Sequence, residues 1–232
     1  MSKLLRFIFL ILSLGSSHIF ASPNYSKEVE KFAETLIFNK YQATFELTEE
    51  QKLYIKANPI SDRMTFTECT IPLEGYIVGD KIKSKTAVKV SCKDDTPWDL
   101  YVRVKVQTLI PLIVSSRPLS KGETLDEENI ELIYKAKSQV RGSTFSELAL
   151  LNGVRLKRNV SSQRGIRFKD VCYVCKGDKV TITANQSGLK IKASGIALTD
   201  GNIGSTVRVK NTRTQREVVG TVYALKEVQV SF

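Results

Sequence analysis

Histidine is almost absent from this sequence: 232 residues hold one, His18, and it lies in an N-terminal stretch that we expect to be removed. A chain without histidine cannot form a Ser-His-Asp or Cys-His catalytic site, or a metal site with imidazole ligands. Carboxylate, lysine and cysteine chemistry stay open. We therefore expect a binding or structural protein rather than an enzyme, with no cofactor and no metal.

Long apolar runs are also scarce. The main one, residues 4–14, follows Lys3, is interrupted by Arg6, and is followed by polar residues and the small Ala21. This pattern is typical of a cleaved secretory signal, here residues 1–21. A membrane anchor is the less favoured alternative, because the run is shorter than the ~20 residues that span a bilayer. We expect an exported chain with no membrane span after cleavage.

Acidic residues are too few to balance the basic ones. The chain has 35 Lys and Arg against 24 Asp and Glu, a formal net charge of +11, which removal of the signal lowers by two. A basic surface suits an acidic protein, a nucleic acid or an anionic lipid, although many basic proteins have no such partner. Export, and the lack of a recognition helix or zinc-finger spacing, argue against nucleic acid.

Cysteine is limited to four residues: Cys69, Cys92, Cys172 and Cys175. An even number in an oxidising compartment favours disulfides, and three pairings are possible. The simplest joins Cys69 to Cys92, worth roughly 3 kcal/mol in the chain-entropy model, and Cys172 to Cys175. The second pair forms a C-x-x-C motif, but no helix follows it as in thioredoxin-like sites. A structural disulfide or buried thiols are favoured over redox exchange or a metal site.

Hydrophobic periodicity predicts one helix followed mainly by strands. Val29, Phe32, Ala33, Leu36 and Ile37 share one face of a helix at residues 24–40. Alternation then predicts strands at 53–57, 82–92 and 100–106, and later at 180–183, 189–192, 207–211, 218–222 and 228–232. Residues 185–188 would form a hairpin turn, and residues 144–151 a short helix.

A phrase in the second half of the sequence is repeated. Residues 117–125 and 158–166 each run from an arginine through an apolar residue and a serine to a glycine, Gly122 or Gly165. Glycine is the usual residue where a turn needs positive φ. The repetition, about 40 residues apart, predicts two similar β corners in one module.

These residues resemble the family of flagellar basal-body P-ring formation chaperones. The matching pieces are Arg117–Leu125, Gly153–Val160, Lys176–Val180, Gly195–Gly204, Val207–Asn211 and Val219–Val222. The first part is also similar to SAF modules, which are small β-clip domains. The C-x-x-C departs from the family, since it replaces positions where plain apolar residues are expected.

The resemblance implies an α+β, mainly β fold with a helix and small sheet at residues 22–106, a SAF-type β-clip at 107–171 and a compact β domain at 172–232. It implies a periplasmic chaperone, working without ATP, whose partner is the P-ring subunit. The clip and the C-terminal sheet would offer an edge or groove. Residues flanking the corners would form a polar rim: Arg117, Arg155, Lys157 and Arg158.

The alternative function is a SAF-containing pilus or secretion assembly protein. Residues 195–204 argue against it, because a SAF module alone does not need that block. The sequence leaves the oligomeric state open.

Overall fold

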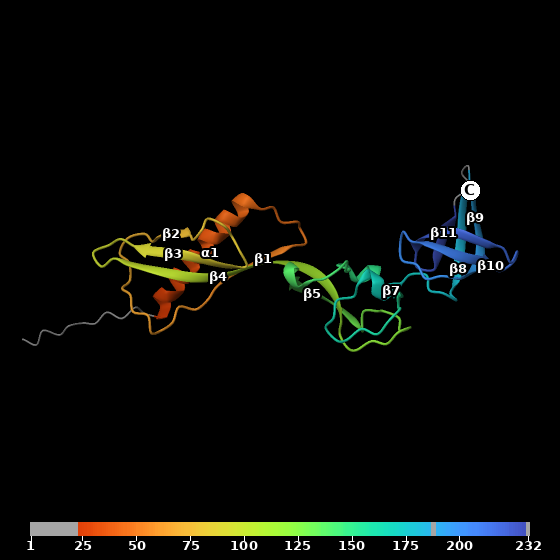
Figure 1. Cartoon of the computed structure of the whole chain (residues 1–232), viewed down its shortest axis with the longest axis horizontal. Coiled ribbons are helices and arrows are strands. Elements are labelled where there is room, and N and C mark those ends of the chain that lie inside the picture. The colour runs from red at the N-terminus through yellow and green to blue at the C-terminus, as the bar shows by residue number, and fades with distance from the viewer. Residues whose placement is uncertain (1–22, 187–188, 231–232) are drawn as a thin grey trace, which may run out of the picture. The chain divides into compact units, whose positions relative to one another are not determined.

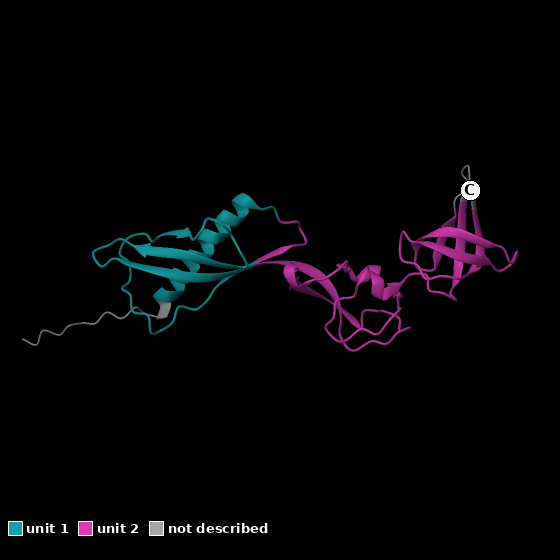
Figure 2. Ribbon diagram, in the orientation of Figure 1, with its two compact units in different colours: residues 1–46, 54–106 teal, residues 47–53, 107–232 magenta. Residues whose placement is uncertain are grey.

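A computed structural model describes residues 23–186 and 189–230 of the chain. The chain forms two compact units (Figure 2): unit 1 comprises the residues up to Glu46 together with Tyr54–Val106, and unit 2 comprises Leu47–Leu53 and the residues from Gln107 onward. Within the described ranges, no helix combines the length and the hydropathy needed to cross a bilayer. The expected signal, residues 1–21, lies outside those ranges.

Unit 1 is built from one helix and a sheet (Figure 1). Helix α1 (Pro23–Thr44) packs against β2 and β3, with Val29, Ala33 and Ile37 fully buried. The predicted helix at 24–40 and its apolar face are thus confirmed. The strands are β1 (Lys52–Ala57), β2 (Glu74–Ile77), β3 (Lys85–Cys92) and β4 (Trp98–Ser115).

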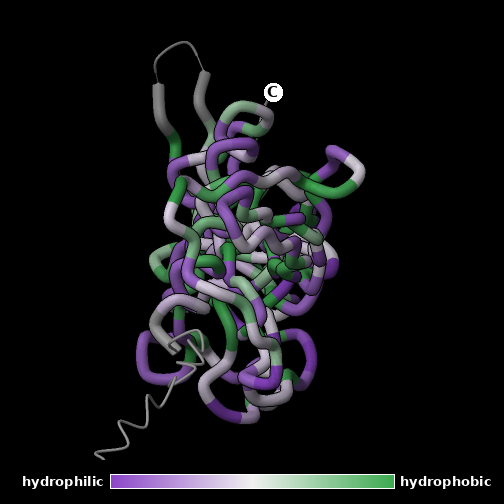
Figure 3. The backbone as a smooth tube through the Cα atoms, turned by 90° about the vertical axis from the view of Figure 1, so that its left-hand side faces the viewer, coloured by the Kyte–Doolittle hydropathy of each residue, from purple (hydrophilic) through white to green (hydrophobic). Residues whose placement is uncertain are grey.

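The sheet of unit 1 has the order β1-β4-β3-β2. Strands β3 and β4 pair antiparallel with Val88 opposite Val102 and Val90 opposite Leu100, and all four side chains are buried. Between them, exposed residues such as Tyr101 face away from the core. Hydrophilic and hydrophobic stretches are intermixed along the backbone (Figure 3).

Strand β4 continues beyond Val106 into unit 2, where it pairs antiparallel with β5 (Ile130–Ala136). The short strands β6 (Arg155–Leu156) and β7 (Val171–Cys172) pair with each other. Three 3-10 turns join these elements: η1 (Lys137–Gln139), η2 (Leu148–Leu150) and η3 (Phe168–Asp170). The helix expected at 144–151 is wrong, since only η2 forms there.

The C-terminal strands close into a barrel in the order β10-β11-β12-β8-β9. They are β8 (Lys179–Gln186), β9 (Leu189–Ala197), β10 (Thr206–Asn211), β11 (Glu217–Ala224) and β12 (Glu227–Val230). The β12–β8 pair is parallel and the others are antiparallel. Residues 187–188 and 231–232, parts of the expected turn and last strand, lie outside the described residues.

We call residues 107–171 the clip. The core of unit 2 runs without a break from the clip to the barrel. It includes Ile113, Leu119 and Val160 from the first part and Val180 and Val230 from the second. The α+β, mainly β fold class is confirmed by the single α-helix, the sheet and the closed barrel among the described residues. The three-domain division at 106/107 and 171/172 stays a prediction.

Candidate partner-binding surface

The two repeated phrases cross each other in unit 2. Leu119 donates its N–H to the carbonyl of Val160 at 2.8 Å and accepts the N–H of Val160 at 2.9 Å. Both side chains are buried. Each phrase therefore pairs with the other rather than with its own flanking strand.

The remaining contacts follow the same two-fold plan. The N–H of Gly122 donates to the carbonyl of Leu156, and the N–H of Gln163 donates to the carbonyl of Ser115, both at 2.8 Å. Likewise, the bridge between Thr124 and Arg155 has its counterpart between Gly165 and Val114. In every case the two members of a corresponding pair are separated by the offset that separates Leu119 from Val160. The clip is thus an internal duplication whose halves complete one another.

The turn positions of the two phrases are Gly122 and Gln163, with φ of 88° and 60°. The expectation that Gly165 takes the left-handed turn position is wrong, because Gly165 does not have positive φ. It corresponds to Thr124, and its lack of a side chain leaves room for Leu112, whose Cδ1 would lie 3.1 Å from an added Cβ. The phrases at 117–125 and 158–166 are in register, but their glycines stand two positions apart within them, so only Gly122 occupies the turn position.

Arg117 lies apart from the other three predicted rim residues. Its Nη2 donates to Glu123 Oε1 at 2.6 Å. Glu123 also accepts the N–H of Ser120 at 2.8 Å, and this backbone bond, followed by the arginine, lowers the pKa of the Glu123 carboxyl. Arg117 therefore belongs to the closure of its own turn.

Arg155, Lys157 and Arg158 lie together along one groove of about 670 Å³, which we call the C-x-x-C groove. Sequence reasoning missed two further lysines that line it. Its basic lining residues are Lys121, Arg155, Lys157, Arg158 and Lys176. Lys121 belongs to the first phrase, whereas the other four residues lie between positions 155 and 176. The crossing of the two phrases therefore brings Lys121 next to them.

The three predicted residues in the groove differ in how firmly they are held. Arg155 pairs with Asp178, whose other oxygen accepts the N–H of Cys175 at 2.8 Å. Arg158 Nε lies 3.5 Å from the buried carboxylate of Asp170. Lys157 makes no ion pair with any residue that the structure describes, so its charge is available to a partner.

The C-x-x-C lines the same groove. Cys172 and Cys175 form a disulfide, and both residues are largely buried, at 3% and 8% exposure. It spans the passage from β7 toward β8, next to the bridge between Val174 and Gly201. A buried disulfide between two strands without a following helix has the character of a structural link.

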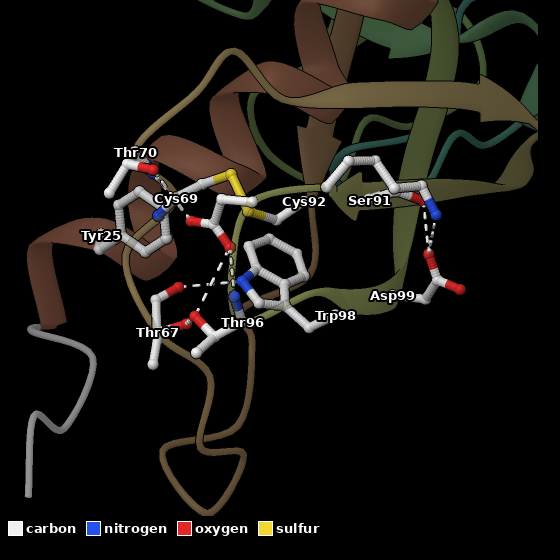
Figure 4. The surroundings of a disulfide bond; sticks show 11 residues. Tyr25, Thr67, Cys69, Thr70, Ser91, Cys92, Thr96, Trp98 and Asp99 are labelled. Carbon is white, nitrogen blue, oxygen red and sulfur yellow. Dashed lines mark hydrogen bonds and ion pairs between the residues drawn. A yellow bond between two sulfur atoms is a disulfide. The ribbon is translucent and has the colours of Figure 1, made fainter.

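The second disulfide, Cys69–Cys92, lies in unit 1 (Figure 4). The N–H of Cys69 donates to the Tyr25 hydroxyl oxygen at 2.9 Å, and burial raises the pKa of Tyr25. The Trp98 indole nearby donates to the carbonyl of Thr67 at 2.9 Å. Asp94 lies close to the two sulfurs, but their bond to each other leaves no thiolate for a metal.

An open sheet edge is not available in the barrel, contrary to one expectation for the C-terminal sheet. Each of its five strands pairs on both sides, because β9 joins β10 and β12 joins β8. Closure of this kind removes the edges that strand addition needs.

Comparison with known proteins gave matches over both units. Residues 110–230 match the family described as "Chaperone for flagella basal body P-ring formation", and residues 26–108 match the FlgA N-terminal domain. The chain is 27% identical over 121 residues to the flagellar protein FlgA of Rhizobium meliloti, covering 51% of this chain and 72% of that protein. It is 24% identical over 121 residues to the flagellar protein FlgA of Agrobacterium fabrum, covering 51% and 75%.

Two solved structures cover most of the chain at low identity. The crystal structure of Salmonella FlgA in its open form covers 88% of this chain and 93% of its own, with 16% identity and a TM-score of 0.44. The crystal structure of FlgA from Thermotoga maritima covers 86% and 71%, with 16% identity and a TM-score of 0.44.

Proposed function

Because this chain belongs to the family of chaperones for flagellar basal-body P-ring formation, we propose that it works in the periplasm by binding the P-ring subunit. Binding holds the subunit, covers its apolar interfaces and ends when ring contacts replace the chaperone. No nucleotide is needed, since each step exchanges one interface for another. The alternative of a pilus or secretion assembly protein is not favoured, because family matches cover both units.

The C-x-x-C groove is our candidate for the subunit-binding surface. Five basic side chains converge there, and that of Lys157 has no ion-pair partner among the described residues. Charges around an interface chiefly steer the encounter and fix the register of binding. The groove would therefore select an acidic feature of the subunit, while apolar contacts around it supply affinity.

The first experiment is capture of the P-ring subunit from a periplasmic extract by the mature chain, with P-rings counted in a deletion strain. We expect specific capture by the chaperone and missing P-rings in the deletion. The absence of capture, together with intact rings, would refute the proposal.

A charge-reversal pair tests the groove separately. Replacing Lys121→Glu and Lys157→Glu, neither of which is in an ion pair with a described residue, is expected to weaken capture about tenfold, since each charged contact contributes up to about 1 kcal/mol. The matched control, Arg213→Glu with Arg216→Glu, reverses two exposed charges on the barrel. Equal loss in both pairs would mean that net charge alone is sensed, and the groove assignment would then fail while the chaperone proposal stands.

The disulfide in the groove is expected to be a link and not a redox centre. Replacing Cys172→Ser and Cys175→Ser should leave subunit capture intact at a temperature where the variant is folded. Because both cysteines line the groove, loss of capture by a variant that circular dichroism shows to be folded would mean that the disulfide takes part in binding, by shaping the groove or by thiol exchange, and would contradict a role as a fold link alone.

A further inference from the structure

A second basic groove lies on the clip and shares no lining residue with the proposed subunit site, although Asp170 lies between Arg167 of this groove and Arg158 of the other. Two hollows of about 330 and 380 Å³ are both lined by Arg141 and Arg167, so they adjoin and are treated as one groove. We call it the Arg141 groove. Its basic lining residues are Lys135, Arg141, Arg164, Arg167 and Lys169.

The positive charge of this groove is largely uncompensated. Arg167 forms an ion pair with buried Asp170, with Arg167 Nε 2.9 Å from Asp170 Oδ2. The other four basic side chains make no ion pair with any described residue, and none of the described lining residues is acidic. Clustered cations repel one another, so a bound anionic partner lowers the energy of this surface.

The walls of the groove are fixed by backbone contacts. Thr144 bridges to Arg167, and the N–H of Phe168 donates to the carbonyl of Ser143 at 3.1 Å. The segment that carries Arg141 is therefore held against the segment that carries Arg167. Preorganised charges bind with a smaller entropic cost than charges on a free loop.

An aromatic ring stands beside the charges. Phe168 is 41% exposed and stacks on buried Phe145 with ring centroids 4.2 Å apart. A single inorganic anion would use neither this ring nor the length of two joined hollows. A flat anionic membrane would not reach side chains on the walls of a concave strip. An extended acidic peptide with an apolar residue matches the charge, the length and the ring.

The groove also has a definite place in the two-fold plan of the clip. Ser162, Gln163 and Lys135 line it, and these are the counterparts of Lys121, Gly122 and Lys176 in the C-x-x-C groove. The clip thus presents a basic hollow on each of its two halves. From this placement and chemistry we propose that the Arg141 groove binds an extended, glutamate- or aspartate-rich polypeptide segment, beyond the contact proposed for the C-x-x-C groove.

The test is fluorescence anisotropy with the mature full chain and a labelled glutamate-rich peptide that carries one central phenylalanine. Wild type is expected to bind, more weakly as salt is raised. Arg141→Gln with Arg164→Gln should weaken binding about tenfold. The matched control, Arg213→Gln with Arg216→Gln, removes the same charge from the exposed barrel loop and should change the Kd less than about twofold.

Phe168→Ala supplies a second, independent readout. It should weaken binding of the phenylalanine peptide but not of the same peptide with glycine in place of phenylalanine. No binding by wild type, or equal losses in both arginine pairs, overturns the proposal. So does an Arg141-groove dependence seen only with phosphatidylglycerol vesicles. Because the groove shares no residue with the C-x-x-C groove, its failure leaves subunit capture untouched, and failed capture leaves this result standing.

Discussion

Asp170 and Asn129 occupy corresponding places in the two halves of the clip, yet one is charged. The Asn129 amide oxygen accepts the N–H of Asp126 and its amide nitrogen donates to Thr124. Asp170 accepts the N–H and the guanidinium of Arg167, and it is fully buried. Arg167, together with Arg158 at 3.5 Å, makes a buried carboxylate tolerable in the second half, whereas the Asn129 side chain is hydrogen-bonded to no cation among the described residues.

Exchanging the two side chains tests this difference. Asn129→Asp would place a carboxylate against the Thr124 carbonyl without a cation and should cost about 3 kcal/mol or more. Asp170→Asn keeps the oxygen that caps the turn and should cost about 2 kcal/mol through loss of the charged bond. Urea unfolding of the two variants measures both values. A harmless Asn129→Asp would contradict this account.

At the scale of the elements, the two crossing turns differ in backbone strain. Gly122 has φ of 88° and no atom within 4 Å of an added Cβ, so Gly122→Ala should cost about 1 kcal/mol from strain alone. Gln163→Gly should stabilise by about 0.5 kcal/mol, reduced by loss of the side-chain bond to Glu131. Thermal unfolding gives the sign of each change in stability. If both variants are destabilised, or both stabilised, backbone strain is excluded as the cause.

The loop that carries Cys69 depends on a carboxylate. Asp94 accepts the N–H of Thr70 at 3.0 Å, and this bond lowers the pKa of Asp94 below its ordinary value of 3.8. A lowered folded-state pKa contributes stability above about pH 3.8, which is lost as the pH falls through the folded value.

The stability difference between wild type and Asp94→Asn should therefore be constant near neutral pH and shrink below about pH 3.8. Chemical unfolding at a series of pH values measures it. Asp95→Asn, an exposed neighbour, is the control and should show no such change. A difference that grows in acid would refute the role of Asp94.

Local patterns predicted most elements because their causes are local. Alternation located β3 and the barrel strands to within a few residues, and the helical face of α1 was identified residue by residue. The predicted helix at 144–151 failed because Phe145, Leu148 and Leu151 are directed into the core by tertiary contacts around one 3-10 turn. Closure of the barrel could not be predicted, since β12 meets β8 across three intervening strands.

The same limit applies to the candidate surface. Arg117, Arg155, Lys157 and Arg158 were predicted together because they flank the two β corners. Lys121 and Lys176 join the last three only through the crossing of the two phrases, which spacing alone does not reveal. Arg117 is held in its own turn by Glu123, which the sequence pattern does not show either.

For the whole molecule, the two units can be observed separately. Trp98, the single tryptophan, packs against Phe66 in unit 1, with the two ring centroids 5.0 Å apart. The contiguous core described above contains residues of unit 2 alone. Tryptophan fluorescence therefore reports on unit 1, whereas circular dichroism reports on both.

Removal of each disulfide should change a different signal. Cys69→Ser with Cys92→Ser should lower the stability seen by fluorescence by about 3 kcal/mol. The Cys172–Cys175 disulfide closes a shorter loop, so replacing Cys172→Ser and Cys175→Ser should cost about 2 kcal/mol of stability. It should leave the midpoint of urea unfolding seen by tryptophan fluorescence unchanged. If each variant shifts the unfolding midpoints seen by both fluorescence and circular dichroism, the two units unfold as one.

The crossing of the two phrases also gives the clip a local symmetry. Leu119 meets Val160, and several further backbone contacts occur as pairs related by the same offset, which is the geometry of an isologous dimer. A peptide of half the length could close the same fold by pairing with a second copy of itself. The two halves of the clip therefore share one backbone plan, and the different side chains of their grooves decide what each groove can bind.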